Sequence, residues 1–124
     1  MDNIVRNFAF DLTRPRRYTY SHESLEELLL LHPDIHSSNF KLANPHSHNI
    51  DVLHLKQSRS DGCILYAHGL GSNKLEALPI AKYFLKQGYD VISFDFSGSG
   101  KSEGDITTYG IYEKEDVVTV LKHI

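Results

Sequence analysis

The sequence predicts an α/β fold in which an antiparallel hairpin is followed by parallel βαβ strands with flanking helices. Residues 39–56 alternate between apolar and polar side chains, as strands with one covered face do. The run 63–67 is continuously apolar, which is typical of a strand covered on both faces, and residues 91–96 are predicted to form a second buried strand. A helical apolar stripe at 76–87 separates them, so strand, helix and strand form a parallel βαβ unit.

Composition bounds the class of protein. The 124 residues are 40% hydrophobic and 23% charged, as in one globular domain. Thirteen basic and sixteen acidic side chains give a net charge of -3, which favours neither nucleic acid nor an anionic membrane as a partner. The local cluster Arg14, Arg16 and Arg17 is interpreted as a solvated tail, with a docking patch for an acidic partner as the alternative.

The single cysteine and the start of the chain suggest a compartment. Cys63 excludes an internal disulfide framework and fits a reducing environment, and its apolar surroundings predict a buried structural thiol. No signal-peptide pattern opens the chain, and the leucine run 28–31 is too short to span a bilayer. We expect a cytoplasmic protein with no membrane span.

Residues 1–37 are predicted to be an N-terminal extension, and residues 38–124 form the main region. The extension begins with a polar, arginine-rich stretch and contains one short helix. Ser24 and Glu27 have capping-box spacing at the start of that helix, and Pro33 ends it. Its apolar face consists of Leu25, Leu28 and Leu29.

The hairpin loop carries two histidines, His46 and His48. A pair of loop histidines can indicate a metal, but no third ligand stands at zinc spacing. We therefore expect no metal and no cofactor, with a metal site as the alternative.

The helices of the main region have recognisable ends. In the helix at 76–87, Pro79 is tolerated only within the first turn, and Gly88 is a stop signal. A last helix is predicted at 113–124, with acidic residues in its first turn. Its predicted buried face consists of Val117, Val120, Leu121 and Ile124. Because no further strand follows, we expect the strand at 91–96 to be left unpaired, as an open edge through which the chain can self-associate.

The stretch "FDFSGSGKSEGD", residues 94–105, nearly matches two nucleotide-binding loops. A phosphate-binding P-loop would need glycine at position 95, where Asp95 would repel phosphate, and no helix follows Ser102 directly. A dinucleotide-binding fingerprint would need glycine at position 103, which is Glu103. Binding of a nucleotide through Lys101 is therefore only the third alternative.

The same stretch matches the G-x-S-x-G pattern of a nucleophile elbow at Ser102. An elbow serine sits between a strand and a helix that adjoin it directly. Here residues 97–101 separate Ser102 from the strand, and no helix is predicted before Glu113. The spacing argues against Ser102 as a nucleophile.

The two motifs "HGLGSN" (68–73) and "FDFSGSGKSEG" (94–104), at their separation, resemble the N-terminal half of the α/β-hydrolase fold. Within that superfamily the chain is most similar to serine aminopeptidase-like hydrolases of a eukaryotic, notably protist and plant, branch. The resemblance covers about residues 40–124. It implies hydrolysis of an ester, amide or thioester through an acyl-enzyme, with a small-molecule or peptide acyl substrate and no cofactor.

By position, the resemblance implies that the backbone amide of Leu70 belongs to the oxyanion hole. His68, Gly69 and Gly71 would shape its turn, and His68 would be a buried histidine that holds the turn by hydrogen bonds. Four residues of the second motif would be structural, namely Asp95, Gly98, Gly100 and Ser102.

The catalytic triad is expected beyond Ile124, with the nucleophile about 15 to 25 residues past the start of the last helix. No catalytic residue is thus expected within the chain. The alternative is a non-catalytic fragment or pseudoenzyme that acts through protein interaction.

Overall fold

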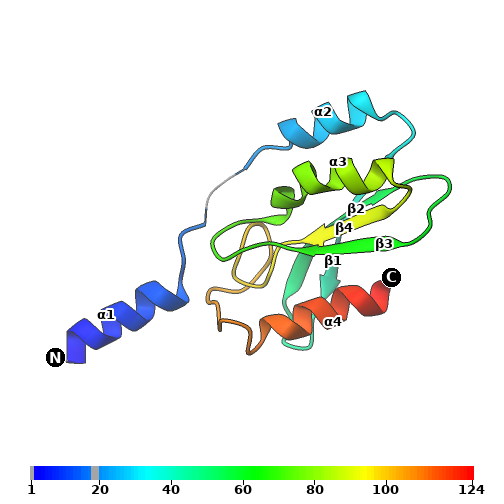
Figure 1. Ribbon diagram of the computed structural model, residues 1–124. Helices are drawn as coiled ribbons and strands as arrows, with labels where there is room; N and C mark the ends of the chain where they lie inside the picture. The colour runs from blue at the N-terminus through cyan, green and yellow to red at the C-terminus, as the bar shows by residue number, and fades with distance from the viewer. Residues whose placement is uncertain (1, 18–19) are drawn as a thin grey trace.

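Four strands form one mixed sheet with the order β1-β2-β4-β3 (Figure 1). The computed structural model describes residues 2–17 and 20–124. The strands are β1 (His36–Ala43), β2 (Asn49–Lys56), β3 (Cys63–Ala67) and β4 (Asp90–Phe94). β1 pairs antiparallel with β2, and β3 pairs parallel with β4. The predicted hairpin and βαβ unit are therefore both confirmed, although the hairpin begins at His36, earlier than predicted.

The prediction that the strand at 91–96 remains unpaired is wrong. β4 lies between β2, with which it pairs antiparallel, and β3. It is a central strand, with Val91 to Phe94 all buried. The open edge belongs instead to β3, where Cys63 to Tyr66 are only half-buried and Ala67 is exposed. The continuous apolar run in β3 predicted full burial, but no described strand flanks its outer side.

Helices cover the two faces of the sheet (Figure 1). α2 (Glu23–Leu31) and α3 (Leu78–Lys86) pack on one face, and α4 (Glu113–His123) packs on the other. The first face buries Leu25, Leu28, Ile35, Leu53, Leu55, Leu78, Ala81, Leu85 and Val91. The second buries Ile50, Val52, Ile92, Phe94 and Val120. Because successive side chains of a strand point to opposite faces, neighbours such as Leu53 and Val52 belong to different cores.

Helix ends differ from prediction in detail. α2 begins at Glu23 with His22 as the N-cap and no side-chain cap bond, so the predicted capping box at Ser24 is not formed. A 3-10 turn, η1 (Lys74–Ala77), precedes α3, which places Pro79 in the first turn of α3 as predicted. Gly88 follows the end of α3, as predicted, and has a left-handed φ of 92°.

The buried face of α4 is rotated from the predicted one. Leu121 and Ile124 are 53% and 54% exposed, and Val117 is half-buried. Asp116 is buried in their place and lies one turn before the buried Val120. Because a carboxylate occupies a buried position of α4, the spacing of the apolar residues alone predicted the wrong buried face.

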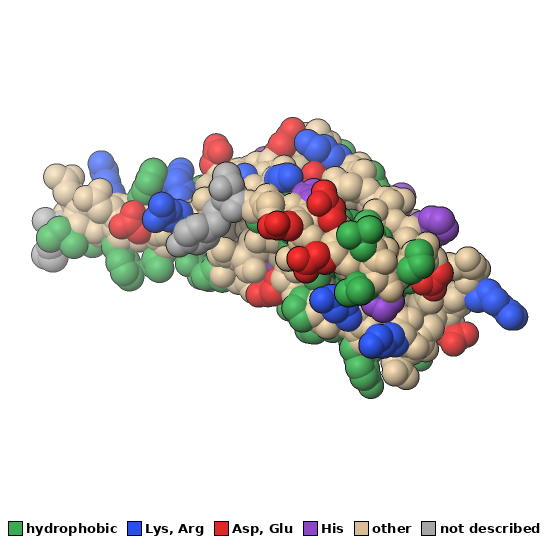
Figure 2. Space-filling model, turned by 90° about the horizontal axis from the view of Figure 1, so that it is seen from above, with side chains coloured by type: hydrophobic (Ala, Val, Ile, Leu, Met, Phe, Trp, Pro, Cys, Tyr) green, Lys and Arg blue, Asp and Glu red, His purple; other side chains and the backbone are tan. Residues whose placement is uncertain are grey.

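An N-terminal helix, α1 (Asp2–Thr13), was not predicted. It extends away from the sheet and its helices and has no buried side chain (Figure 1). Figure 2 shows apolar side chains along it, and these include Ile4, Val5 and Phe8. Its last turn touches the body, where the Thr107 amide donates to the Thr13 carbonyl at 2.7 Å. Over the described ranges, no helix is long and apolar enough to cross a membrane.

Candidate functional site

The turn that follows β3, residues 68–71, is fixed by the His68 side chain. His68 is buried, and its Nε2 accepts a hydrogen bond from the Phe96 amide at 3.1 Å. Its Nδ1 lies 2.7 Å from the Gly69 carbonyl oxygen. Because one ring nitrogen accepts and the other faces an acceptor, the imidazole is neutral with its proton on Nδ1. His68 thereby joins the end of β3 to the segment that follows β4.

Glu76, a residue that the sequence analysis did not single out, holds the same turn. Its Oε2 accepts from the Gly69 amide at 2.9 Å and from the Tyr66 hydroxyl at 3.1 Å. Burial alone would raise the pKa of Glu76, but hydrogen bonds from Gly69 and Tyr66 lower it below its usual value. Glu76 lies in the 3-10 turn before α3, and a single carboxylate there leaves no periodic signal in the sequence.

The Leu70 amide makes no hydrogen bond to any residue that the structure describes. Gly71 reverses the chain directly after it with a φ of 73°, and the Ser72 amide closes the turn on the Gly69 carbonyl at 3.1 Å. An open hollow of about 300 Å³ adjoins the turn. Its lining consists of His68, Gly69, Leu70, Phe96, Ser99, Thr107, Tyr109, Gly110 and Glu113. A free backbone donor beside such a hollow can bind a developing negative charge on a ligand.

Asp95 joins this turn to the glycine-rich loop. Its carboxylate is fully buried, and Oδ1 accepts from the Lys74 amide at 2.6 Å. Oδ2 accepts from the Lys101 amide at 2.9 Å and from the Lys74 ammonium at 3.2 Å. The Lys74 side chain is itself completely buried and also reaches Asp51 Oδ1 at 2.8 Å. A buried lysine between two carboxylates was not predicted from the sequence.

Ser102 cannot act as a nucleophile in this structure. It is 2% exposed, and its hydroxyl donates to the Asp95 carbonyl at 2.5 Å. The same oxygen accepts from the Asp51 amide at 2.7 Å. The hydroxyl is therefore used to join the glycine-rich loop to β2.

The glycine-rich loop has no phosphate cradle. The Gly98 amide donates to the Glu103 carbonyl, the Ser99 amide to Phe96, and the Lys101 amide to the Asp95 carboxylate. Since an anion-binding loop needs unpaired amides that point at the ligand, these three amides, which are paired within the protein, are not free to bind a phosphate. Gly98 and Gly100 adopt left-handed φ values of 81° and 51°, as a tight loop requires.

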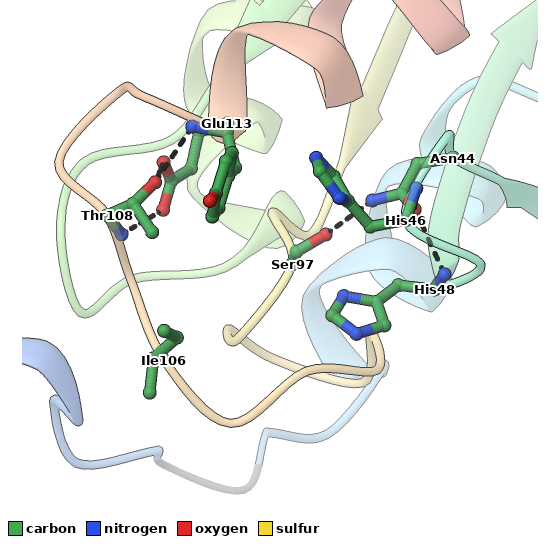
Figure 3. Close-up of a pocket in the computed structure, with 8 residues that line it drawn as sticks. Asn44, His46, His48, Ser97, Ile106, Thr108 and Glu113 are labelled. Carbon is green, nitrogen blue, oxygen red and sulfur yellow. Dashed lines mark hydrogen bonds between the residues drawn. The ribbon is translucent and has the colours of Figure 1, made fainter.

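A second hollow, of about 250 Å³, lies between the hairpin loop and the start of α4 (Figure 3). Asn44 organises it, because its Oδ1 accepts from the amides of His46 and His48 and its Nδ2 donates to Asp116 at 2.7 Å. His46 Nε2 lies 2.5 Å from Glu115. Within the described ranges, no three histidine, cysteine or acidic side chains are placed to hold a metal ion.

Cys63 and His54 lie close together but lack the properties of a catalytic pair. The distance from Sγ to Nε2 is 3.8 Å. Burial raises the pKa of the Cys63 thiol and lowers that of His54, so both groups are held neutral. An activated thiolate needs the opposite shifts.

Comparison with known proteins agrees with this geometry. No protein-family model matches the chain. The chain is 32% identical over 87 residues to an uncharacterized protein, YqkD, of Bacillus subtilis; the match covers 68% of this chain and 28% of YqkD. The chain thus spans less than a third of that relative.

Solved structures extend the comparison. The esterase Pf2001 of Pyrococcus furiosus matches with a TM-score of 0.68 and 23% identity, over 88% of this chain and 41% of the esterase. The mouse alpha/beta hydrolase domain-containing protein 10 matches with a TM-score of 0.55 and 28% identity, over 70% of this chain and 35% of that protein. The chain therefore has an α/β-hydrolase fold and spans about two fifths of the length of the esterase it matches.

Proposed function

We propose that this chain, which corresponds to the N-terminal part of an α/β-hydrolase fold, supplies the oxyanion-binding turn of a serine hydrolase. The reaction would be hydrolysis of an ester, amide or thioester through an acyl-enzyme intermediate. The observation that carries the proposal is the Leu70 amide, unpaired among the described residues, beside an open hollow at the end of β3. The esterase among the similar structures supports the reaction class.

The division of labour follows from the fold. The nucleophilic serine, the acid and the histidine would lie beyond Ile124, with the serine on a strand that pairs with the free edge of β3. When its Oγ attacks the substrate carbonyl, the Leu70 N–H would donate to the oxygen that gains charge. One such donor contributes on the order of 3 kcal/mol in a dry, preorganised site.

On its two motifs, we infer that the chain is nearest to the serine aminopeptidase-like hydrolases, and that a small-molecule or peptide acyl group is its substrate. The lone, half-buried Cys63 suits a reducing compartment, so we place the protein in the cytoplasm.

A matched pair of variants tests the oxyanion donor. The open reading frame that contains these residues is expressed in full and treated with a fluorophosphonate probe and with activated esters. Leu70→Pro removes the N–H and should lower kcat about 100- to 1,000-fold. Leu70→Ala keeps the N–H and should retain most activity, because the leucine side chain is 63% exposed.

Two results would contradict the proposal. One is a reading frame that adds no nucleophile after residue 124. The other is a labelled, active protein in which Leu70→Pro and Leu70→Ala have the same kcat.

A second candidate function is association through the free edge of β3. Its side chains are apolar and half-buried, and its outer side is not paired within the described residues. Under this alternative the chain is non-catalytic and binds a protein strand, including that of a second copy. Sedimentation velocity of the chain as a function of its concentration tests this association.

A further inference from the structure

Three N-terminal side chains, Arg17, Tyr20 and His22, contact the glycine-rich loop 97–105 and are called the strap here. The Arg17 guanidinium donates to the Ser102 carbonyl at 2.8 Å and to the Gly104 carbonyl. It also lies 3.5 Å from the Gly100 carbonyl. A planar guanidinium presents several donors in a fixed fork, so one side chain can hold several carbonyls of a loop in register. This arrangement corrects the interpretation of Arg17 as part of a solvated tail.

Tyr20 reaches the buried Asp95 carboxylate. Its hydroxyl donates to Asp95 Oδ2 at 2.5 Å and accepts from the Lys74 ammonium at 2.5 Å. Burial and the adjacent Asp95 raise the pKa of Tyr20 far above its ordinary value, so the phenol remains a donor. Lys101 of the glycine-rich loop also contacts the strap. Its Nζ lies 5.1 Å from the centre of the Tyr20 ring and 3.2 Å from His22 Nε2.

The charge balance of the buried cluster explains why a donor is needed there. Asp51 and Asp95 carry two negative charges, and Lys74 carries one positive charge, with side chains that are at most 5% exposed. A buried net negative charge is unfavourable unless further donors surround it. The Tyr20 hydroxyl supplies such a donor to Asp95, in addition to the Lys74 and Lys101 amides.

The contacts continue from the strap to the oxyanion turn. Asp95 accepts from the Lys101 amide of the glycine-rich loop and from the Lys74 amide, which follows the turn at Gly71 by three positions. A shift of the Asp95 carboxylate would therefore move both segments together. The Tyr20 hydroxyl donates a hydrogen bond directly to that carboxylate.

We propose that Arg17 and Tyr20 are positioning residues that hold the glycine-rich loop and, through Asp95, the turn that carries Leu70. Neither residue lines the hollow beside Leu70, and their catalytic relevance rests on the proposed hydrolase function. The strap contacts themselves are testable without any activity.

Amide hydrogen exchange of the 124-residue chain tests Tyr20. Tyr20→Phe keeps the ring and removes the hydroxyl, so exchange of the Lys74 and Lys101 amides should become about 10- to 100-fold faster, the range for loss of a hydrogen bond to a charged group. Central amides such as that of Ile92 should change much less. Tyr83→Phe, at an exposed position on α3, is the matched control and should change neither set.

Arg17 is tested in the same way against a neighbouring arginine. Arg17→Ala should speed exchange of the Gly98 and Ser102 amides, which close the loop internally. Arg17→Lys should restore part of the protection, because it keeps the charge but loses the fork. Arg14→Ala is the control, since Arg14 lies over the Phe10 ring at 4.3 Å. The proposal would be overturned if the Tyr20 and Arg17 variants exchanged loop and central amides faster by the same factor. It would also be overturned if these variants left the exchange rates of both sets unchanged.

The complete reading frame then separates the two proposals. If the wild-type enzyme is active, Tyr20→Phe should lower kcat about tenfold or more with little change in KM, because the donor geometry and not substrate binding is altered. An inactive wild-type protein whose strap variants still show local exchange effects would reject the hydrolase and retain the strap. Unchanged kcat in an active Tyr20→Phe enzyme would reject the positioning role.

Discussion

Gly100 sits where the Asp95 carboxylate leaves no space for a side chain. A Cβ at this position would lie 2.3 Å from Asp95 Cγ, and φ is 51°. Gly110 offers a matched contrast, because its φ is 103° and no atom lies within 4 Å of its would-be Cβ. Both glycines are thus held in left-handed backbone, but only Gly100 also faces a buried charge.

This contrast predicts unequal losses of stability. Gly110→Ala should lower the free energy of unfolding by about 1 kcal/mol through backbone strain. Gly100→Ala should cost about 3 kcal/mol or more, because it must also displace a buried, hydrogen-bonded carboxylate. Urea unfolding of the two variants measures the difference. Similar losses would mean that Asp95 shifts freely.

Residue roles were predictable only where a motif marked them. The resemblance assigned Asp95 a bracing role and His68 a hydrogen-bonding role, and both side chains are buried and hydrogen-bonded. Lys74 and Tyr20 had no such marker. A lysine is rarely buried unless paired, and its partners lie 21 to 54 positions away in sequence, beyond any local pattern.

At the scale of elements, Glu113 anchors the loop 107–110 to the first turn of α4. Its carboxylate accepts from the Thr108 amide at 2.6 Å, from Thr107 Oγ1 at 2.9 Å and from the Gly110 amide at 3.0 Å. Burial alone would raise the pKa of Glu113, but hydrogen bonds from the Thr108 side chain and amide and from Thr107 outweigh it and lower the pKa to about 2.

The lowered pKa predicts how stability depends on pH. Since the folded pKa of about 2 lies below the ordinary value of 4.5, the contribution is complete above about pH 4.5 and is lost as pH falls toward 2. Glu113→Gln should therefore weaken the loss of stability between pH 6 and about pH 3, measured by urea unfolding. Glu26→Gln, at an exposed position on α2, makes the same charge change as a control. An identical pH profile for all three proteins would refute the assignment.

With the exception of α1, elements with a local signal were predicted, and their spatial order was not. The alternation in 39–56 and the strand-helix-strand pattern in 63–96 are local, so the hairpin and βαβ unit were found. The insertion of β4 between β2 and β3 depends on pairing between distant segments, which periodicity does not encode. α1 did carry a helical signal, since Ile4, Phe8 and Leu12 recur every fourth residue.

At the scale of the whole molecule, the two sheet edges differ in chemistry. Polar side chains protect the β1 edge, namely His36, Ser37, Ser38, Asn39 and Lys41. The β3 edge, Cys63–Ala67, carries no charged residue. Charged and polar residues on an edge suppress strand pairing between molecules, so association is expected at β3.

The chain should accordingly self-associate as its concentration rises from micromolar to submillimolar, measured by sedimentation velocity. Tyr66→Lys puts a charge on the β3 edge and should reduce association, while Ser38→Lys puts the same charge on β1 as a control. Association that both variants reduce equally would exclude β3 as the specific edge. The complete reading frame should associate less if a further strand pairs with β3.

The strap has a consequence for how the chain is made on the ribosome. Tyr20 is synthesised 75 residues before Asp95, and Arg17 is synthesised 87 residues before Gly104. At about 5–20 residues per second, 75 residues take roughly 4–15 s. During that interval the nascent segment that contains the strap and the exposed apolar side chains of α1 has no loop to bind, so the strap closes late and this segment is open to chaperones.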